Sequence, residues 1–406
     1  MRKHLLSLAL AAAATTTSLI GGGCQQKPAA APAAAIVNLP AESFKREWGA
    51  NLILKDDAVS RVIVGADTVF VYTGKNDAYA LNRAGGQVRF GRHITDSLVA
   101  LHDPVVLKES IVFPTDSTLE IYRPDGRPVR SYQTSSSLRT NAVGEPTGTT
   151  LFFGVDAPGA GRITAVETAP SPYQAVREAW ALMAGNGVQV SAAPAVLGGT
   201  VFAGFDNGEV FAVNAETRQP VWPTSTGQTF RTSGAINADL RVDDFGVYVA
   251  STDSQLYCLD RAQGKLKWRY YAGAALRQAP AVTATTVYLP VAGRGVAAID
   301  KVNGPEIRGA KWVVRDAVKL LAEDERYAYF QRGDNRIVAI DRSTGEQRFT
   351  SKRTDLVAFG TNTTGATIYA ATKAGQVLAI TPVLKAGDTG ELAWDDARPV
   401  GAVALR

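Results

Sequence analysis

Short apolar runs alternate with polar turns along most of this chain, and the turns contain Gly, Asn, Asp and Ser at close spacing. Residues 247–268 (VYVASTDSQLYCLDRAQGKLKW) show the pattern best. Two apolar runs flank a polar turn, and a Gly-containing turn leads to a tryptophan. Alternation of apolar and polar positions between such turns is typical of antiparallel β-strands. The pattern therefore predicts a succession of β-hairpins.

The same pattern occurs eight times, with successive copies starting 42, 40, 50, 46, 40, 41 and 40 residues apart. A repeat of this period indicates an array of small units, none of which buries its apolar face alone. We therefore expect one body rather than the two or three domains that a length of 406 residues would otherwise suggest. The copies start at Val69, Ile111, Leu151, Val201, Val247, Val287, Ala328 and Ile368.

An aromatic residue closes every copy. In five copies it stands 21 residues after the start, and in the other three it stands 29, 25 and 26 residues after the start. Five of the six tryptophans hold this position, and the sixth, Trp48, precedes the first copy by 21 residues. We expect these side chains to pack one unit against the next. The closing residues are Phe90, Tyr132, Trp180, Trp222, Trp268, Trp312, Phe349 and Trp394.

Each copy reads as four short strands. In the fourth copy, the strands are predicted at residues 195–197, 201–204, 209–213 and 220–222. Residues 176–182 (VREAWAL) have helical propensity, but their place in the third copy predicts a fourth strand there. Four-stranded units repeated at this period predict an all-β fold, namely an eight-bladed β-propeller of four-stranded antiparallel blades.

The ends of the chain must close the ring, because an open ring would expose free strand edges. Residues 43–48 (SFKREW) read as a fourth strand placed before the first blade. We expect this strand, with Phe44 and Trp48, to pair into the last blade. Residues 391–394 (ELAW) compete for the same outer position, and the sequence leaves the choice open.

The first residues read as a targeting segment. Arg2 and Lys3 precede an apolar, Ala-rich run of about 16 residues, which is short for a membrane span and typical of a signal peptide. The following Gly-Gly-Gly-Cys resembles the lipobox of bacterial lipoproteins, although Gly21 stands where a Leu is usual. The resemblance implies cleavage before Cys24 and its acylation. An ordinary secretory signal is the alternative.

Three regions follow from these patterns: a lipoprotein signal peptide at residues 1–23, the lipidated Cys24 with a flexible linker at 24–42, and the propeller at 43–406. Residues 25–35 (QQKPAAAPAAA) have the Ala/Pro composition of a tether. Gln25 after the cysteine resembles the sorting signal of lipoproteins sent to the outer membrane. The resemblance implies a lipid-anchored protein of the outer membrane that faces the periplasm.

The charge of the chain argues against nucleic-acid binding, and its motifs give little indication of a catalytic site. The net charge is +5, or +3 without residues 1–23, and no block of Lys and Arg stands out. His93 and His102 have no Cys or carboxylate at metal-ligand spacing, and no nucleophile or phosphate-loop motif occurs. Cys258, in the run LYCLD, reads as a buried, inert thiol. We therefore expect no catalytic residue, no metal and no cofactor.

In several copies the turn after the third strand begins with an Asx residue and reaches a glycine four residues later, as in Asp260 to Gly264. Copy four has Arg218 where this glycine would stand. The pattern Y-x-L-D-x-x-x-G-x-x-x-W resembles the PQQ-type, quinoprotein-like propeller repeat over roughly residues 43–395. The resemblance allows a quinoprotein dehydrogenase as the alternative function. Those enzymes bind a quinone with Ca²⁺ and carry an adjacent Cys pair, which this chain lacks.

A lipid-anchored, eight-bladed propeller of this length resembles the BamB-type lipoproteins. The resemblance implies a non-enzymatic scaffold, a monomeric propeller that docks on the barrel-assembly machinery. Residues 191–194 and 204–208 resemble the corresponding blade of that family. The family's Leu-Arg pair and D-x-D motif, which are implicated in docking, are replaced in this chain by residues 188–189 (VQ) and 235–237 (AIN). Another envelope partner therefore remains an alternative.

Overall fold

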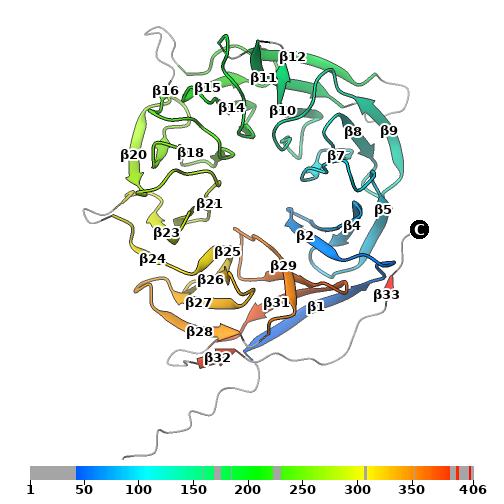
Figure 1. Cartoon of the computed structure of the whole chain (residues 1–406), viewed down its shortest axis with the longest axis vertical. Helices are drawn as coiled ribbons and strands as arrows, with labels where there is room; N and C mark the ends of the chain where they lie inside the picture. Colours follow the sequence, from blue (N-terminus) through cyan, green and yellow to red (C-terminus); the bar gives the residue numbers. More distant parts are fainter. Residues whose placement is uncertain are drawn as a thin grey trace, which may run out of the picture. The chain divides into compact units, whose positions relative to one another are not determined.

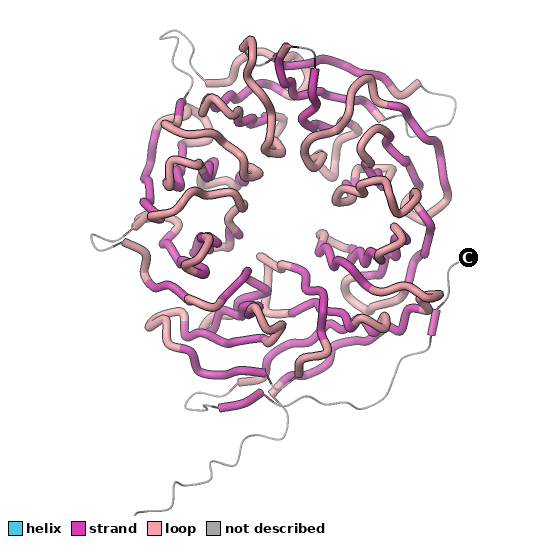
Figure 2. The backbone as a smooth tube through the Cα atoms, viewed as in Figure 1, coloured by secondary structure: helices cyan, strands magenta, loops and turns pink. Residues whose placement is uncertain are grey.

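The described residues form β-strands and their connections, with no helix among them. Eight β-sheets stand radially around one axis, so the predicted all-β, eight-bladed propeller is confirmed (Figures 1 and 2). In the part of the chain that the structure describes, there is no helix long and apolar enough to cross a membrane. This computed structural model describes residues 43–157, 159–168, 175–183, 185–222, 230–305, 309–351, 353–384, 390–392 and 402–403.

The blades follow one another along the chain, and within each blade every strand is hydrogen-bonded to the strand named after it. Blade one contains β2 (Val59–Val64), β3 (Thr68–Thr73), β4 (Asp77–Asn82) and β5 (Val88–His93). Blade two contains β6 (Val105–Val106), β7 (Ile111–Pro114), β8 (Thr118–Tyr122) and β9 (Pro128–Gln133). Blade three contains β10 (Thr150–Ala157), β11 (Ala160–Glu167) and β12 (Arg177–Met183). Blade four contains β13 (Ala195–Leu197), β14 (Thr200–Gly204), β15 (Glu209–Asn214) and β16 (Phe230–Arg231).

The second half of the ring has the same plan, with two extra strands near the chain's end. Blade five contains β17 (Arg241–Val242), β18 (Val247–Ala250), β19 (Gln255–Leu259) and β20 (Leu266–Tyr271). Blade six contains β21 (Ala281–Val282), β22 (Thr286–Val291), β23 (Gly295–Asp300) and β24 (Trp312–Val314). Blade seven contains β25 (Ala317–Glu323), β26 (Tyr327–Arg332), β27 (Ile337–Asp341), β28 (Gln347–Ser351) and β32 (Gly390–Leu392). Blade eight contains β29 (Leu356–Gly360), β30 (Ile368–Thr372), β31 (Gln376–Pro382), β1 (Phe44–Leu52) and β33 (Ala402–Val403).

The amino-terminal strand closes the ring. Strand β1 pairs antiparallel with β31 of blade eight, from Phe44 opposite Pro382 to Asn51 opposite Gln376 (Figure 1). Residues 391–392, which competed for this position, belong instead to β32, and β32 lies parallel to β28 of blade seven. Strand β33 lies parallel to β1 at the outside of blade eight. The first and last blades are thus joined through backbone hydrogen bonds.

Blades seven and eight each carry a fifth strand, and among the described residues blades three and four lack a strand at a predicted place. Blade three has three strands, and two isolated bridges, Leu138↔Val155 and Val143↔Phe152, stand where its inner strand was expected. In blade four the outer strand predicted at residues 220–222 is reduced to a bridge at Pro220, and β16 follows later in the chain. Proline has no N–H to donate to a ladder, which explains the weak pairing there. Strand β12 forms as predicted.

The core lies between neighbouring blades. The middle strands of each blade face a blade on both sides, so they read as continuous apolar runs, and every residue of β3 is buried. One cluster joins blades five and six through Tyr248, Trp268 and Leu289. We letter the strands of each blade a to d from the axis outward, so that in blade one they are β2, β3, β4 and β5. The a–b and c–d turns lie at one end of the blades because antiparallel strands reverse at each turn. We call this the turn end, and the end with the b–c turns and inter-blade connections the loop end.

Candidate functional site

Closing aromatic side chains pack on the c–d turn of the next blade. The Trp268 indole donates its Nε1–H to the Lys301 carbonyl at 2.9 Å. It also lies against Gly304, where an added Cβ would come within 2.6 Å of the ring. Gly304 has a φ of 73°, so glycine suits this position for both space and conformation. The same pairing occurs at Trp48 with Gly86, Phe90 with Gly126, Trp222 with Gly264 and Trp312 with Gly345.

The other predicted residues lie as follows. Phe349 is buried and meets the Tyr327 ring edge-on at 5.8 Å between centroids. Tyr132 is half-buried in β9, at the cluster between blades two and three. Trp180 is half-buried and donates to the Ala215 carbonyl at 2.8 Å. Phe44 and Trp48 are buried in blade eight. The predicted signal peptide, Cys24, the linker up to residue 42 and Trp394 lie outside the described residues.

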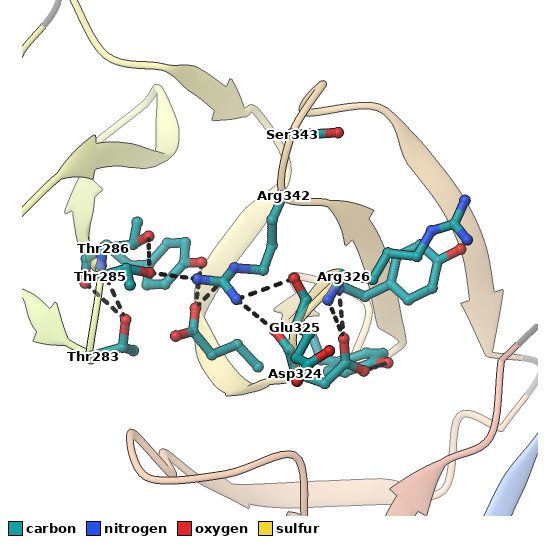
Figure 3. A network of polar contacts seen from close by, with 12 residues as sticks. Thr283, Thr285, Thr286, Asp324, Glu325, Arg326, Arg342 and Ser343 are labelled. Atoms are coloured by element: carbon teal, nitrogen blue, oxygen red, sulfur yellow. Dashed lines mark hydrogen bonds and ion pairs between the residues drawn. The ribbon is translucent and has the colours of Figure 1, made fainter. Parts of the chain in front are cut away.

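Arg342, which follows the Asx residue of the c–d turn in blade seven, clamps that blade to blade six. Its Nη2 donates to Thr285 Oγ1 at 2.6 Å, and its Nη1 donates to the Asp324 carbonyl at 2.5 Å (Figure 3). Its Nε lies 3.3 Å from the buried Glu323 carboxylate, to which the Tyr288 hydroxyl donates at 2.7 Å. Burial, followed by the Glu323 charge, holds the pKa of Tyr288 well above its usual value. The phenol is therefore a permanent donor.

Two other interfaces carry the same kind of clamp. In blade one, Arg83 donates to Asn362 Oδ1 at 2.8 Å and to the Tyr369 hydroxyl at 3.1 Å, which ties blade one to blade eight. In blade six, Lys301 forms an ion pair with Asp243 of blade five at 3.0 Å. The sequence patterns did not single out these cations. The recurring Asx–Arg or Asx–Lys pair at the start of the turn was the available signal.

A cavity of about 670 Å³ lies along the inner strands of blades five to eight. Arg241, Arg277, Lys319, Asp239 and Asp243 supply its charged lining. Such a volume is within the usual range of ligand sites. The lining is mixed in charge, which suits a polar polypeptide surface or loop better than an apolar small molecule.

Asp239 belongs to a polar network that runs between blades near the axis. It accepts from the Ala193 N–H at 2.9 Å and from Asn141 Nδ2 at 3.4 Å. Asn141 in turn accepts from the Asp103 N–H, and Asp103 pairs with Arg61 at 3.0 Å. These bonds tie the connections entering blades two, three, four and five into one surface.

Lys319 stands on the inner strand of blade seven and donates to the Phe359 carbonyl at 2.6 Å. Burial lowers the pKa of Lys319, and the Asp103 charge acts in the opposite direction. Lys319 is half-buried, whereas Arg241 and Arg277 are exposed, so these two arginines are the cations of this cavity that best suit a contact with another molecule.

Residues 188–189 and 235–237, which stand where the family has its docking motifs, contact the turn at residues 204–208 at the loop end. Asp206 and Gln189 exchange two bonds, with the Asp206 N–H donating at 3.1 Å and the Gln189 N–H donating to the Asp206 side chain at 2.9 Å. The Ile236 N–H donates to the Phe205 carbonyl at 3.2 Å. A carboxylate stands close to the expected acidic motif: Asp239, two residues after Asn237, which the sequence patterns did not single out.

Among the described residues, no metal site of the kind that accompanies a quinone is present. No group of three His, Cys, Asp or Glu side chains among them is arranged to hold an ion. His93 is exposed and pairs with Asp77 at 2.8 Å, whereas His102 is partly buried, and burial lowers its pKa. Cys258 is buried, which raises the pKa of its thiol to about 12, and the sequence has no adjacent cysteine. The described side chains therefore offer no support for quinone chemistry.

Comparisons with known proteins show a family match and similar solved structures. A family model described as PQQ_2, outer membrane protein assembly factor BamB, matches residues 45–244 and 206–321. The crystal structure of BamB from Moraxella catarrhalis is 16% identical, covering 84% of this chain and 99% of that one, with a TM-score of 0.61. Quinohemoprotein alcohol dehydrogenase from Comamonas testosteroni is 13% identical, covering 86% of this chain and 78% of that one, with a TM-score of 0.60. No curated protein matches the chain significantly.

Proposed function

This chain belongs to the family of the outer membrane protein assembly factor BamB, and on that basis we propose that it is a non-enzymatic scaffold of the cell envelope. It supports the insertion of β-barrel proteins into the outer membrane by docking on the barrel-assembly machinery. The observation that carries the proposal is the family match over more than half of the chain. The likeness to quinohemoprotein dehydrogenases concerns the fold, because sequence identity to the Comamonas testosteroni enzyme is 13%.

The docking surface of the proposal is the axial side of blades four to seven. There the connection with Ala193 and the segment from Asn237 to Asp239 are held by hydrogen bonds, and Arg241 and Arg277 extend from the same side as exposed cations. A surface that is already ordered loses little conformational freedom when a partner binds. Exposed arginines are well suited to donate to carboxylates and carbonyls of a partner protein.

The anchoring half of the proposal rests on the sequence. Acylation of Cys24 and the Ala/Pro linker would hold the propeller at the periplasmic face of the outer membrane. Mass spectrometry of the mature amino-terminal peptide tests this part. The expected result is a diacylglyceryl-modified, acylated Cys24, and Cys24→Ala should release the protein from the membrane fraction. An unmodified amino terminus at another residue would contradict it.

The docking half is tested by purifying the tagged full chain from detergent-solubilised outer membranes. We expect the barrel-assembly complex to co-purify, and the double variant Arg241→Ala/Arg277→Ala to recover at least tenfold less of it. The matched control is Arg123→Ala/Lys265→Ala, which removes two exposed cations from the turn end and should leave recovery unchanged. Recovery of the protein alone from native membranes would contradict the proposal.

The enzymatic alternative predicts different behaviour. A quinoprotein dehydrogenase reduces a dye acceptor when it is given an alcohol or aldose, and the quinone absorbs visible light. We expect neither activity nor quinone absorbance from the purified chain after incubation with the quinone and Ca²⁺. Substrate-dependent bleaching of the dye would replace the scaffold proposal with an oxidoreductase.

A further inference from the structure

The interface between blades three and four lacks the clamp that joins other blades. Ala215 holds the position that Arg342 has in blade seven. The Ala215 N–H donates to the Gly199 carbonyl, and its own carbonyl accepts from the Trp180 indole at 2.8 Å. Arg342 makes the same two backbone contacts, with the Arg326 carbonyl and the Trp312 indole. The backbone is therefore equivalent, but the cation is missing, and Val196 and Phe152 stand where the clamped interface has Glu323 and Tyr288.

Two of the acceptors that surround the Arg342 guanidinium have counterparts here, a threonine hydroxyl and the carbonyls of an a–b turn. Thr149 stands two residues before the start of copy three, as Thr285 stands two residues before copy six. Thr285 accepts from Arg342, as Figure 3 shows, and Thr149 lines a cavity next to Ala215. The a–b turn of blade four, which includes Gly199, holds the place of the turn that gives Arg342 its carbonyl acceptors.

A cavity of about 610 Å³ occupies this place between blades three and four. Glu145, from the a–b turn of blade three, lines it and accepts from the Gly199 N–H at 3.1 Å. Glu145 forms no ion pair with any described residue, whereas Glu167, which also lines the cavity, is paired with Arg177 at 2.7 Å. Glu216, which also lines the cavity, likewise forms no ion pair with a described residue, so the unpaired charge of the cavity is negative at Glu145 and Glu216.

The aromatic lining also differs from that of the clamped interfaces. Blades five, six and eight have Tyr248, Tyr288 and Tyr369 one residue after the start of the copy, and each hydroxyl contacts a group of its own clamp. Blade three has Phe152 at this position, beside Trp180. The cavity therefore offers a carboxylate, a hydroxyl, backbone carbonyls and two aromatic faces, which is the environment an arginine side chain prefers.

We propose that this cavity binds an arginine side chain presented by a partner polypeptide, which completes from outside the clamp that the chain itself lacks. The site lies at the turn end and is separate from the axial surface proposed for docking. The two unpaired carboxylates hold a free cation only weakly, because each exposed ion pair contributes about 0–1 kcal/mol. A polypeptide adds contacts around the cavity, so it is the occupant that this site selects.

The first test measures binding of a short peptide, acetyl-Gly-Arg-Gly-amide, to the full chain by NMR titration. Its control is the same peptide with citrulline, which keeps the shape of arginine and removes the charge. We expect saturable binding that is at least tenfold tighter for arginine, a difference of about 1.4 kcal/mol. Equal binding of the two peptides, or no saturable binding, would overturn the proposal.

The second test changes residues of the cavity itself. Ala215→Arg should supply the missing clamp, raise the melting temperature and abolish peptide binding. Glu145→Gln should weaken binding by up to about fivefold with little effect on folding, because it removes one ion pair. Glu346→Gln changes an exposed glutamate on the c–d turn of blade seven and should leave binding unchanged. Peptide binding that is unchanged in both Ala215→Arg and Glu145→Gln would mean that the peptide arginine binds elsewhere, which would contradict the proposal.

Two further outcomes separate other occupants. Tighter binding of spermidine than of the arginine peptide would identify a free polyamine as the ligand. Self-association of the chain that Ala215→Arg abolishes would identify a second copy. Either result would contradict the proposed partner. Neither depends on recovery of the barrel-assembly complex, so this inference and the proposed function succeed or fail separately.

Discussion

The interface between blades six and seven and the interface between blades three and four share one backbone plan. At both, an indole of the first blade donates to the c–d turn of the next, through Trp312 and Trp180. At the first interface, Arg342, Glu323 and Tyr288 fill the space behind the indole. At the second, a cavity of about 610 Å³ lies there.

The difference shows that two layers of interaction hold neighbouring blades together. The indole and the turn set the distance between blades and recur around the ring. The polar clamp behind them is replaceable, because the interface between blades three and four keeps its backbone contacts without a cation at the position of Arg342. Where the residue at this position no longer joins two blades, as at Ala215, the space beside it becomes available for binding. Substitutions at the two interfaces test whether they differ in packing and in stability.

The largest expected effect is at the indoles. Trp312→Ala should cost about 4 kcal/mol of unfolding free energy, because Trp312 is buried and meets the Tyr288 and Phe330 rings. Trp180→Ala should cost only about 2 kcal/mol, since Trp180 is half-buried beside a cavity. Urea unfolding followed by circular dichroism measures both. Equal losses would mean that the two interfaces are equally packed.

The second-largest loss of unfolding free energy is expected when the polar clamp is removed. Arg342→Ala should cost about 3 kcal/mol, because it leaves the buried Glu323 carboxylate without its cation. The change is measured by urea unfolding.

Two controls accompany this variant. Arg123→Ala removes an exposed arginine from the c–d turn of blade two and should change stability by less than about 0.5 kcal/mol. Glu323→Gln in the Arg342→Ala background should restore part of the loss. No recovery in the double variant would show that the loss comes from packing rather than from the unpaired charge.

A smaller effect is expected at Arg218, the residue that replaces the turn glycine at the interface of blades three and four. Arg218 has a φ of 60°, which an L-residue adopts at a cost. Arg218→Gly should therefore stabilise the protein by about 1 kcal/mol. Arg218→Ala keeps the strain and loses the bond from Nη1 to the Ala181 carbonyl, so it should not stabilise. Equal stability of the two variants would argue against backbone strain.

The last prediction compares how readily a reagent reaches a cysteine in a clamped interface and a cysteine in the cavity between blades three and four. It involves no change in stability. Burial raises the pKa of the Cys258 thiol to about 12, so at pH 8 it is almost entirely protonated and should react with iodoacetamide only over many hours. A cysteine introduced by Ala215→Cys should react within minutes, because it faces the cavity. Peptide mapping by mass spectrometry distinguishes the two sites. Fast labelling at Cys258 would mean that the clamped region opens readily.

Much of the fold was readable from the sequence because its signals are local. The period of the repeat, the closing aromatic residues and the Asx–Gly turns each depend on neighbours in the chain, and they predicted eight blades. The exceptions have specific reasons. Pro220 weakens the outer strand of blade four, and isolated bridges replace the inner strand of blade three. Neither departure leaves a strong mark on the apolar pattern.

The candidate sites were less predictable. Arg342 and Ala215 hold equivalent positions, but their importance depends on what the preceding blade places opposite them. Asp239 was missed because its partners, Asn141 and Ala193, are far away in the sequence. A local pattern does not show which side chains from different blades meet.

By itself, the sequence determined the blade count, the strands and the aromatic side chains that join one blade to the next, because hydrogen-bonded turns and alternating apolar residues act over a few positions. Only the tertiary structure decided that β1 rather than the carboxyl-terminal strand completes blade eight, and that one interface keeps a cavity where others keep a cation. Both outcomes depend on contacts between segments that are distant along the chain, where the volume and charge of opposing side chains decide which arrangement is most stable.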